Sequence, residues 1–337
     1  MKLSEIGEFG FIDSIKTLCD TSRKGMIKGI GDDCAVFRPS RGRVLLFTTD
    51  MLVEDIHFLR DTVAFYQLGW KVIAVNLSDI AAMGGRPLVS LISLAIPVEM
   101  NLEVVQKLYR GMEDICKHYQ VGIVGGDTVA SPERLVLNAS VIGDAKENEV
   151  LYRSGAGPGD KIYLTGNLGD SSAGLKILKN EISPPESIGS FFIKAHNEPI
   201  PLLETGRMVA ASRLANAMID LSDGLLSDLR HICRESGVGA LLHADKIPLS
   251  PELRLLASHA NFNPLDLALS GGEDYQLLFT VPEAKAQEIE KLFKDHRLSP
   301  PFLIGEIRQE RGIQMVNDDG SVLELRPQGF NHFRQYL

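Results

Sequence analysis

The apolar residues of this chain fall into short segments that alternate between strand-like and helical patterns. Val44–Thr49 (VLLFTT) has the composition of a buried strand, and a helical stretch follows from about Ala64 to Met83. Val89–Ile96 and Leu135–Ile142 are predicted strands, and Leu102–Tyr119 has helical periodicity. Mixed elements of this kind form sheets covered by helices, which predicts the α/β (α+β) class.

The second half has the same mixed character, after a stretch of linker-like composition between Asp144 and Asp160. There the charged stretch DAKENE leads through Arg153 into SGAGPGD, which is rich in glycine and proline. Because 337 residues correspond to about two domains, we predict an N-terminal domain at 1–145 and a C-terminal domain at 146–337. In the second, we expect strands at Lys161–Thr165, Leu277–Val281, Phe302–Ile307 and Ile313–Val316, and helices at Ser171–Lys179 and Pro282–Phe293.

Charge and cysteine usage narrow the class of protein. The chain has 35 Lys+Arg against 44 Asp+Glu, a net charge of −9, which disfavours nucleic-acid binding. Four scattered cysteines indicate reduced thiols. The N-terminus carries glutamates where a signal peptide needs apolar residues, and Leu88–Met100 is too short to span a bilayer and contains Pro97. We therefore expect a cytoplasmic protein without a membrane segment.

The common phosphate-binding signatures do not occur in the sequence. It contains no P-loop, no protein-kinase motif set, no complete dinucleotide glycine loop and no nucleophile elbow. The eight histidines show no paired spacing, which argues against a zinc site. If this protein binds phosphate groups, it must do so through residues other than these motifs.

Aspartates that lie next to glycines or after apolar runs are the candidate residues for such a site. A single aspartate of this kind is ordinarily a turn former or helix cap, but here there is a series. Its members are Asp32 and Asp33 (GIGDDCA), Asp50 (TTDML), Asp79 (NLSDIAAMGG), Asp127 (GGDT), Asp220 and Asp223 (DLSDG), and Glu273 and Asp274 (SGGED). Asp50, Asp127 and Asp220 follow apolar runs, so we expect them at carboxyl ends of strands, where α/β sheets bind ligands.

Asp79 lies in a largely apolar helical segment and shares a face with Asn76 and Met83. Either this face is exposed or the carboxylate has a cation or hydrogen-bond partners, and we favour a ligand role. Clustered carboxylates favour Mg²⁺, which prefers oxygen ligands together with substrate phosphates. Thr48 and Thr49 could add a hydroxyl or carbonyl oxygen beside Asp50.

A set of motifs in fixed order carries a family resemblance. GIGDDCA, TTD, HF, NLSDIAAMG, GGDT, RSGAGPGD, DLSDGL, SGGEDYQL and GFNHF follow one another between Gly29 and Phe333. Together they resemble the thiamine-monophosphate kinase family, within the superfamily of aminoimidazole-ribonucleotide synthetases and selenophosphate synthetase. NLSDIAAMGG alone is typical of the superfamily, and the ordered set is typical of the kinases.

The resemblance implies ATP-dependent phosphorylation of thiamine monophosphate to thiamine diphosphate. It implies a two-domain aminoimidazole-ribonucleotide-synthetase-like fold, with an N-terminal mixed sheet that forms a homodimer and a C-terminal α/β domain. By motif, the Mg²⁺ ligands would be Asp33, Thr48, Thr49, Asp50, Asp79, Asp127, Asp220 and Asp223. ATP would meet Gly126, Asp127, Arg153 and Ser222, with Tyr109 a further candidate, and the thiamine moiety would meet His57, Glu273 and Phe330.

Some positions depart from the family pattern. Leu202 stands where an arginine often follows the P-x-P, Asn331 stands for an aspartate, and Gln276 stands for a glutamate. None is a candidate metal ligand. Without the motifs, Arg153 would be a solvated linker residue, Phe330 a core residue and His57 a surface imidazole.

The chemistry of the acceptor predicts that no catalytic base is needed. A phosphate monoester has a second pKa of about 6, so near neutral pH it is already a nucleophile. The obstacle is repulsion between two anions, which several Mg²⁺ ions relieve while the groups are held in line.

Three alternatives remain at this point. The first is another ATP-dependent synthetase of the superfamily, although Cys19 lies outside the glycine-rich context expected for a selenophosphate synthetase. The second is a Mg²⁺-dependent phosphohydrolase, because clustered aspartates also build two-metal hydrolases. The third is a thiamine-phosphate binding protein without turnover.

Overall fold

The computed structural model describes residues 26–28, 32–40, 42–185 and 187–325. Three residues discussed above, Cys19, Phe330 and Asn331, lie outside this part of the chain. Within it, no helix combines the length and the apolar character needed to cross a membrane. The cytoplasmic location stays a prediction.

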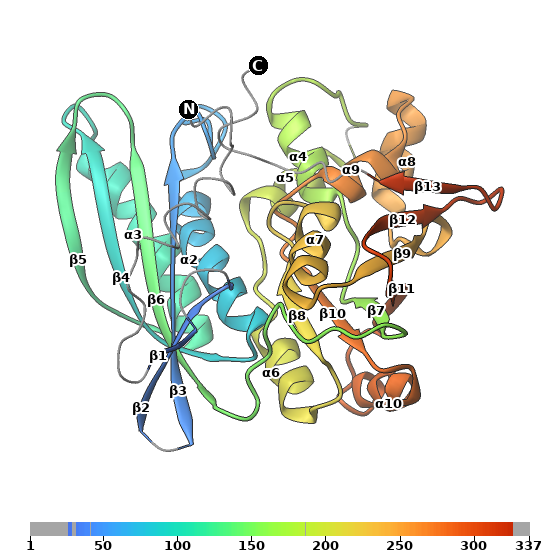
Figure 1. Cartoon of the computed structure of the whole chain (residues 1–337). Helices are drawn as coiled ribbons and strands as arrows, with labels where there is room; N and C mark the ends of the chain where they lie inside the picture. Colours follow the sequence, from blue (N-terminus) through green and yellow to red (C-terminus); the bar gives the residue numbers. More distant parts are fainter. Residues whose placement is uncertain (1–25, 29–31, 41, 186, 326–337) are drawn as a thin grey trace, which may run out of the picture.

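The first sheet has six strands in the order β1-β2-β3-β6-β4-β5. The β4–β5 pair is parallel and the other pairs are antiparallel. Helices α2 and α3 lie against one of its faces (Figure 1). The elements are β1 Met26–Lys28, β2 Ala35–Ser40, β3 Arg43–Val53, α2 Phe65–Ala82, β4 Arg86–Pro97, α3 Leu102–Tyr119, β5 Gly122–Ser131 and β6 Val136–Lys146.

The alternation of side chains along β3 shows why the two faces of this sheet differ. Val44 and Leu46 are fully buried beneath the helices, whereas Phe47 and Met51 point the other way and are 38% and 53% exposed. Leu91 on β4 and Val129 on β5 are also large, apolar and exposed. The sheet therefore has an inner face that packs on α2 and an outer face that carries apolar side chains.

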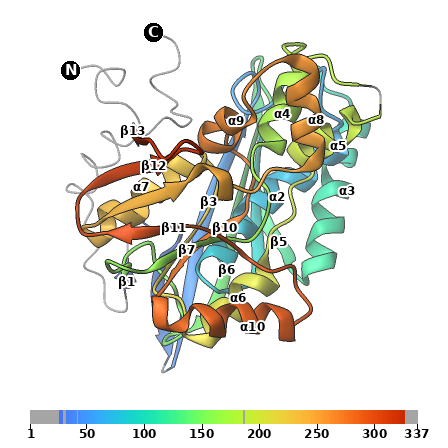
Figure 2. The same cartoon turned by 90° about the vertical axis from the view of Figure 1, so that its right-hand side faces the viewer.

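The second sheet has seven strands in the order β13-β12-β9-β11-β7-β10-β8. Its β9–β12 pair is parallel and the others are antiparallel. Helix α7 contacts β8, β9 and β12 (Figure 2). The elements are β7 Lys161–Leu164, α4 Asp170–Leu178, α5 Gly189–Asn197, α6 Leu203–Ser212, β8 Ala217–Asp220, α7 Leu225–Ser236, β9 Gly239–His243, α8 Pro251–Ala260, α9 Pro264–Ser270, β10 Leu277–Val281, α10 Ala286–Asp295, β11 Phe302–Arg308, β12 Gly312–Val316 and β13 Val322–Leu325, with single 3₁₀ turns at Ala244–Lys246 and Glu283–Lys285.

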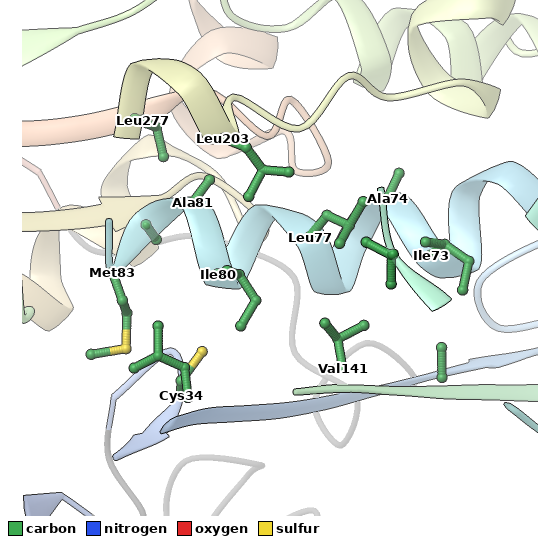
Figure 3. Packing of buried hydrophobic residues seen from close by; sticks show 14 of the residues in the cluster. Cys34, Ile73, Ala74, Leu77, Ile80, Ala81, Met83, Val141, Leu203 and Leu277 are labelled. Carbon is green, nitrogen blue, oxygen red and sulfur yellow. The ribbon is translucent and has the colours of Figure 1, made fainter. Parts of the chain in front are cut away.

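Helix α2 is buried between the two sheets and joins their cores. Ile80 faces the first sheet, while Ala81 approaches α6 of the second half (Figure 3). A Cβ atom added to Gly206 would lie 2.1 Å from the Ala81 carbonyl oxygen, so only glycine permits this approach. Leu77 is fully buried, and removing such a side chain typically costs about 2–5 kcal/mol. This packing fixes the position of every polar side chain that α2 carries.

The predicted helices at 64–83 and 102–119 agree with α2 and α3, but two strand ends were predicted wrongly. Asp50 lies inside β3, which pairs residue for residue with β6 from Arg43 to Val53. Asp127 lies inside β5, which continues through Gly125 and Gly126. Strands continue where backbone pairing continues, whatever the side chain, and Gly126 is required because a Cβ there would lie 1.7 Å from the Ile92 carbonyl oxygen. Only Asp220 ends its strand, β8.

Candidate active site

Three carboxylates from distant parts of the chain meet where the two sheets adjoin. Asp33 precedes β2, Asp79 lies in the last turn of α2, and Asp220 is the last residue of β8. One carboxylate oxygen from each lies within 4.8 Å of the other two. Asn76 and Met83, which share the helix face of Asp79, are fully buried, so this face is not the exposed one. We call these three residues the carboxylate cluster.

The carboxylates of the cluster are buried close together and repel one another. Burial raises the pKa of Asp79 well above its usual range, and the neighbouring charges of Asp50, Asp220 and Asp33 raise it further. Burial and Asp33 likewise raise the pKa of Asp220. The pKa of Asp50 is raised to about 6 by burial and by Asp33. Like charges held together away from water favour either protonation or a bound cation.

Hydroxyl groups and one guanidinium stabilise the cluster in part. Thr48 Oγ1 donates to Asp79, and Ser78 Oγ donates to Asp220 Oδ2 at 2.6 Å. Arg153 donates through Nε and Nη2 to the two oxygens of Asp33, each at 2.9 Å. Although burial opposes it, this pairing raises the pKa of Arg153 further above its usual value. Arg153 is therefore an internal counter-ion of the cluster and not a solvated linker residue.

A further buried carboxylate, Asp228, supports the loop after β8 and was not singled out from the sequence. Asp228 Oδ2 accepts the backbone N–H groups of Asp223 and Gly224, both at 3.1 Å. Its position near the start of α7, four residues after a glycine, is the available signal, because carboxylates there accept backbone N–H groups that the helix leaves unpaired. Asp228 thereby fixes the backbone that carries Asp223.

A cavity of about 700 Å³ opens from the cluster toward α4 and α5. This volume is within the usual range for small-molecule sites. Its lining includes Asp50, Asp79, Asp220, Ser222 and Asp223 at the carboxylate end, and His57, Leu68, Lys71, Val75, Leu175, His196, Glu273 and Tyr275 elsewhere.

Glu273 is paired with two residues that were not predicted, Lys71 and His196. Lys71 Nζ lies 2.8 Å from Glu273 Oε1, and His196 Nδ1 lies 3.3 Å from Glu273 Oε2. Burial alone would raise the pKa of Glu273, but these two neighbours hold it below its usual value. Lys71 could have been found from the sequence, because a lone lysine inside an otherwise apolar helix requires a buried partner.

Comparisons with known proteins agree with the motifs. Residues 31–145 match the model "AIR synthase related protein, N-terminal domain", and residues 157–317 match the corresponding C-terminal domain. A thiamine-monophosphate kinase of Aquifex aeolicus is 36% identical over 337 residues, covering 99% of this chain and 100% of the relative. That of Escherichia coli K12 is 37% identical, covering 97% and 98%. A solved structure of AaThiL complexed with AMPPCP and TMP superposes with a TM-score of 0.85 at 35% identity, covering 98% and 99%.

The chain belongs to the thiamine-monophosphate kinase family. The predicted two-domain fold with a mixed sheet in each half is thereby confirmed. Of the family-motif residues, the structure brings Asp33, Thr48, Asp79, Arg153 and Asp220 into direct contact or close approach. Asp50, Ser222 and Asp223 line the same cavity.

His57, a motif residue of the thiamine-monophosphate kinase family, lines the cavity beyond the cluster. The Val53 N–H donates to His57 Nδ1 at 3.0 Å, so the neutral imidazole carries its proton on Nε2. The ring is half-buried. This placement fits a substrate contact better than a surface imidazole.

Other residues assigned by kinase-family motif lie apart from the cluster. Asp50, Ala139, Ile92 and Gly126 are in register across four strands, which places Gly126 about 14 Å from Asp50. Asp127 is in register with Ser93 on the outer face, opposite the cluster.

Two further motif residues do not direct their side chains toward the carboxylate cluster. The hydroxyl of Thr49 faces outward, where it contacts Ser140 Oγ at 2.8 Å, so only its backbone lies toward the cluster. Tyr109 is exposed on α3 and is not part of the cavity lining. Phe330 lies outside the described residues.

Proposed function

We propose that the chain transfers the γ-phosphoryl group of ATP directly to the phosphate of thiamine monophosphate, in the cavity next to the carboxylate cluster. The observation that carries this proposal is the convergence of Asp33, Asp79 and Asp220 within 4.8 Å at the end of a cavity of about 700 Å³. Family membership supplies the reaction, and a relative solved with AMPPCP and TMP supports the pair of substrates.

The cluster fits Mg²⁺. Its donors are hard oxygen atoms, and the pKa values of Asp50, Asp79 and Asp220 are raised because the carboxylates are buried together. Asp33, Asp50, Asp79, Asp220 and Asp223 would hold several ions, with Thr48 as a further oxygen donor. When bound, Mg²⁺ supplies positive charge that offsets repulsion between the two phosphate groups.

The side chains around the cluster bind and orient; none acts as a base. Arg153 uses two of its five N–H donors on Asp33, which leaves three for the phosphates of ATP. Ser222 lines the cavity between Asp220 and Asp223 and supports a role beside the nucleotide. The acceptor phosphate is itself the nucleophile, so the protein holds it in line with the γ-phosphorus.

The thiamine moiety would occupy the rest of the cavity. His57 and Glu273 contribute polar groups there, and Leu68, Val75 and Leu175 contribute apolar surface. This mixture suits a heteroaromatic molecule that carries a positive charge. Phe330 would stack on one of its rings.

A homodimer through the first sheet is part of the proposal. Its outer face exposes Phe47, Met51, Leu91 and Val129, which a second copy would cover. The edge strand β5 carries Gly126 and Asp127, and Asp127, in register with Ser93 on the outer face, would come close to that copy. This arrangement would explain why residues assigned to ATP and Mg²⁺ lie apart from the cluster within one chain. The division at residues 145 and 146 remains part of this proposal.

One incubation tests the function. The protein, ATP, Mg²⁺ and thiamine monophosphate are combined, and thiamine diphosphate, ADP and free phosphate are quantified. Thiamine diphosphate formed in equal amount to ADP supports the kinase. Free phosphate alone would indicate a phosphohydrolase, and no product with retained binding would indicate a binding protein. Asp79→Asn is the matched negative control, because it removes one cluster charge from a helix that stays packed.

A further inference from the structure

We infer that Lys71 is a positioning residue, which together with His196 holds the Glu273 carboxylate toward the cationic heteroaromatic part of the substrate. Nothing in the family motifs quoted above assigns a role to either Lys71 or His196. The inference rests on the proposed function, since it concerns the recognition of thiamine monophosphate in the same cavity. It predicts that Lys71 acts through Glu273 and does not touch the substrate itself.

The burial of Lys71 is the first observation. Its side chain is 2% exposed, on a helix whose neighbouring positions are apolar. A buried ammonium is expensive without partners. Lys71 Nζ has two, Glu273 Oε1 at 2.8 Å and His196 Nε2 at 3.4 Å. Replacing both members of a buried ion pair by apolar side chains is often neutral or stabilising, so stability alone does not account for this pair.

The protonation of His196 follows from its contacts. The Lys71 ammonium can only donate, so His196 Nε2 is an acceptor and the neutral ring carries its proton on Nδ1. That Nδ1 lies 3.3 Å from Glu273 Oε2 and 3.1 Å from Ser171 Oγ. Burial and the nearby Lys71 charge lower the pKa of His196 to about 4, which agrees with a neutral ring. Each carboxylate oxygen of Glu273 is therefore paired with a protein group, Oε1 with Lys71 and Oε2 with His196.

The backbone around Glu273 is held in an uncommon conformation. Glu273 and Tyr275 have positive φ angles of 65° and 49°. Non-glycine residues adopt this region rarely, and such strain persists where the surroundings impose it. The Glu273 N–H donates to the Ser222 carbonyl oxygen at 2.7 Å, and a Cβ on Gly272 would lie 2.4 Å from that same oxygen. The loop that carries Glu273 thus packs closely against the Asp220–Asp223 segment. The ion pair with Lys71 then fixes the carboxylate of Glu273.

The position of the pair within the cavity indicates which part of the substrate it serves. Lys71, Val75 and Asp79 follow one another at four-residue intervals on α2, and all three line the cavity. Eight residues of helix place Lys71 about 12 Å from Asp79 along the axis. The phosphate of the substrate belongs at the Asp79 end, beside the metal ligands. The Lys71–Glu273 pair therefore lies at the end for the thiazolium and aminopyrimidine rings.

Both side chains line the cavity, and Glu273 is the more exposed of the two. The Glu273 side chain is 25% exposed, whereas that of Lys71 is 2% exposed behind it. An ionised carboxylate attracts a permanently cationic ring and accepts hydrogen bonds from an amino group. A lysine in the same place would repel that ring. The geometry thus assigns contact to Glu273 and support to Lys71.

A double-mutant cycle tests this division of roles. Steady-state kinetics with thiamine monophosphate and ATP, and calorimetric binding of thiamine monophosphate without ATP, are measured for Glu273→Gln, Lys71→Met and the double variant. We expect Lys71→Met and Glu273→Gln each to raise the KM for thiamine monophosphate on the order of 10-fold and to change the KM for ATP less than about twofold. The double variant should match Glu273→Gln alone. Lys71→Arg should restore part of the loss.

Lys161→Met is the matched control, because Lys161, like Lys71, has two side-chain partners, here Glu283 at 3.0 Å and Glu306 at 3.1 Å, but lies outside the cavity lining. It should leave both KM values unchanged. If Lys71→Met does not fold, Glu273→Gln can still be compared with the double variant, which carries neither charge of the pair. Equal KM values for thiamine monophosphate in these two variants would then support the inference.

Several results would overturn the inference while the proposed function stands: a double variant clearly worse than Glu273→Gln, an equal rise in both KM values, or no effect of Lys71→Met. A wild-type protein that neither binds nor phosphorylates thiamine monophosphate overturns both the inference and the proposed function.

Discussion

Asp50→Asn should stabilise the metal-free protein while it removes activity. The raised pKa of Asp50, about 6 against an ordinary 3.8, means that the folded state binds its proton more tightly than the unfolded state does. Stability therefore falls as pH rises through this interval, and the full penalty is present above pH 6. At about 1.4 kcal/mol per pKa unit, the two-unit difference corresponds to roughly 3 kcal/mol near pH 8.

The asparagine side chain carries no charge, so the variant avoids this penalty. Without metal at about pH 8, we expect its free energy of unfolding to rise by up to about 3 kcal/mol, and its Tm by roughly 5 °C. At about pH 5, where Asp50 is largely protonated in the folded protein, the gain should be about half as large. Activity should fall on the order of 100-fold or more if Asp50 holds Mg²⁺ as proposed.

Thermal unfolding in the presence of a chelator, at both pH values, measures the effect. Added Mg²⁺ should raise the Tm of the wild type more than that of the variant, since ligand binding stabilises the state that binds it. Asp295→Asn, at the exposed end of α10, is the control and should change neither Tm nor activity. A lower Tm for Asp50→Asn at pH 8, with activity reduced only in proportion to folded protein, would make Asp50 structural and refute the reasoning.

Three further outcomes are expected. His57→Gln should raise the KM for thiamine monophosphate and leave the acidic limb of the pH–rate profile near pH 6, where the acceptor phosphate ionises; loss of that limb would make His57 a base. Phe330→Ala should raise the KM for thiamine monophosphate several-fold with the KM for ATP unchanged, consistent with a stacking contribution of about 0.5–1.5 kcal/mol; equal changes in both would exclude stacking on the substrate. Met51→Glu on the outer face should yield monomers in sedimentation experiments, whereas Leu255→Glu, similarly exposed at 52% but on α8, should not; an unchanged sedimentation coefficient for Met51→Glu would contradict the proposed interface.

Helix α2 could be predicted from the sequence because its signals are local. An apolar run that ends at Gly84 and Gly85 defines both its length and its end. Asp79 could be singled out within it for the same reason, since a carboxylate among apolar residues needs a partner wherever the helix packs. Asp220 was also placed correctly, because β8 is short and ends at the first residue of the DLSDG segment.

The positions of Asp50 and Asp127 depend on partners far away in the sequence. β3 extends past Asp50 because β6, about 90 residues later, continues to pair with it. β5 extends past Asp127 because β4 runs parallel to it as far as Ser131. The polarity of the side chains in one strand does not show how far a distant strand continues to pair with it. The same holds for Lys71 and His196, which are 125 positions apart and meet only after both halves have packed on α2.

The carboxylate cluster and the Lys71–Glu273 pair both involve α2 but differ in their balance of charge. At Asp79, three carboxylates are brought together, and the Arg153 guanidinium, which is hydrogen-bonded to Asp33, offsets only part of their charge. At Lys71, each buried charge already has a partner within the protein. A site that awaits cations must leave its anions under-neutralised, whereas a site that orients an organic cation must keep its carboxylate fixed and ionised. Because α2 is packed rigidly between both sheets, it holds these two ends at a constant separation, which suits a substrate with a phosphate at one end and a cationic ring at the other.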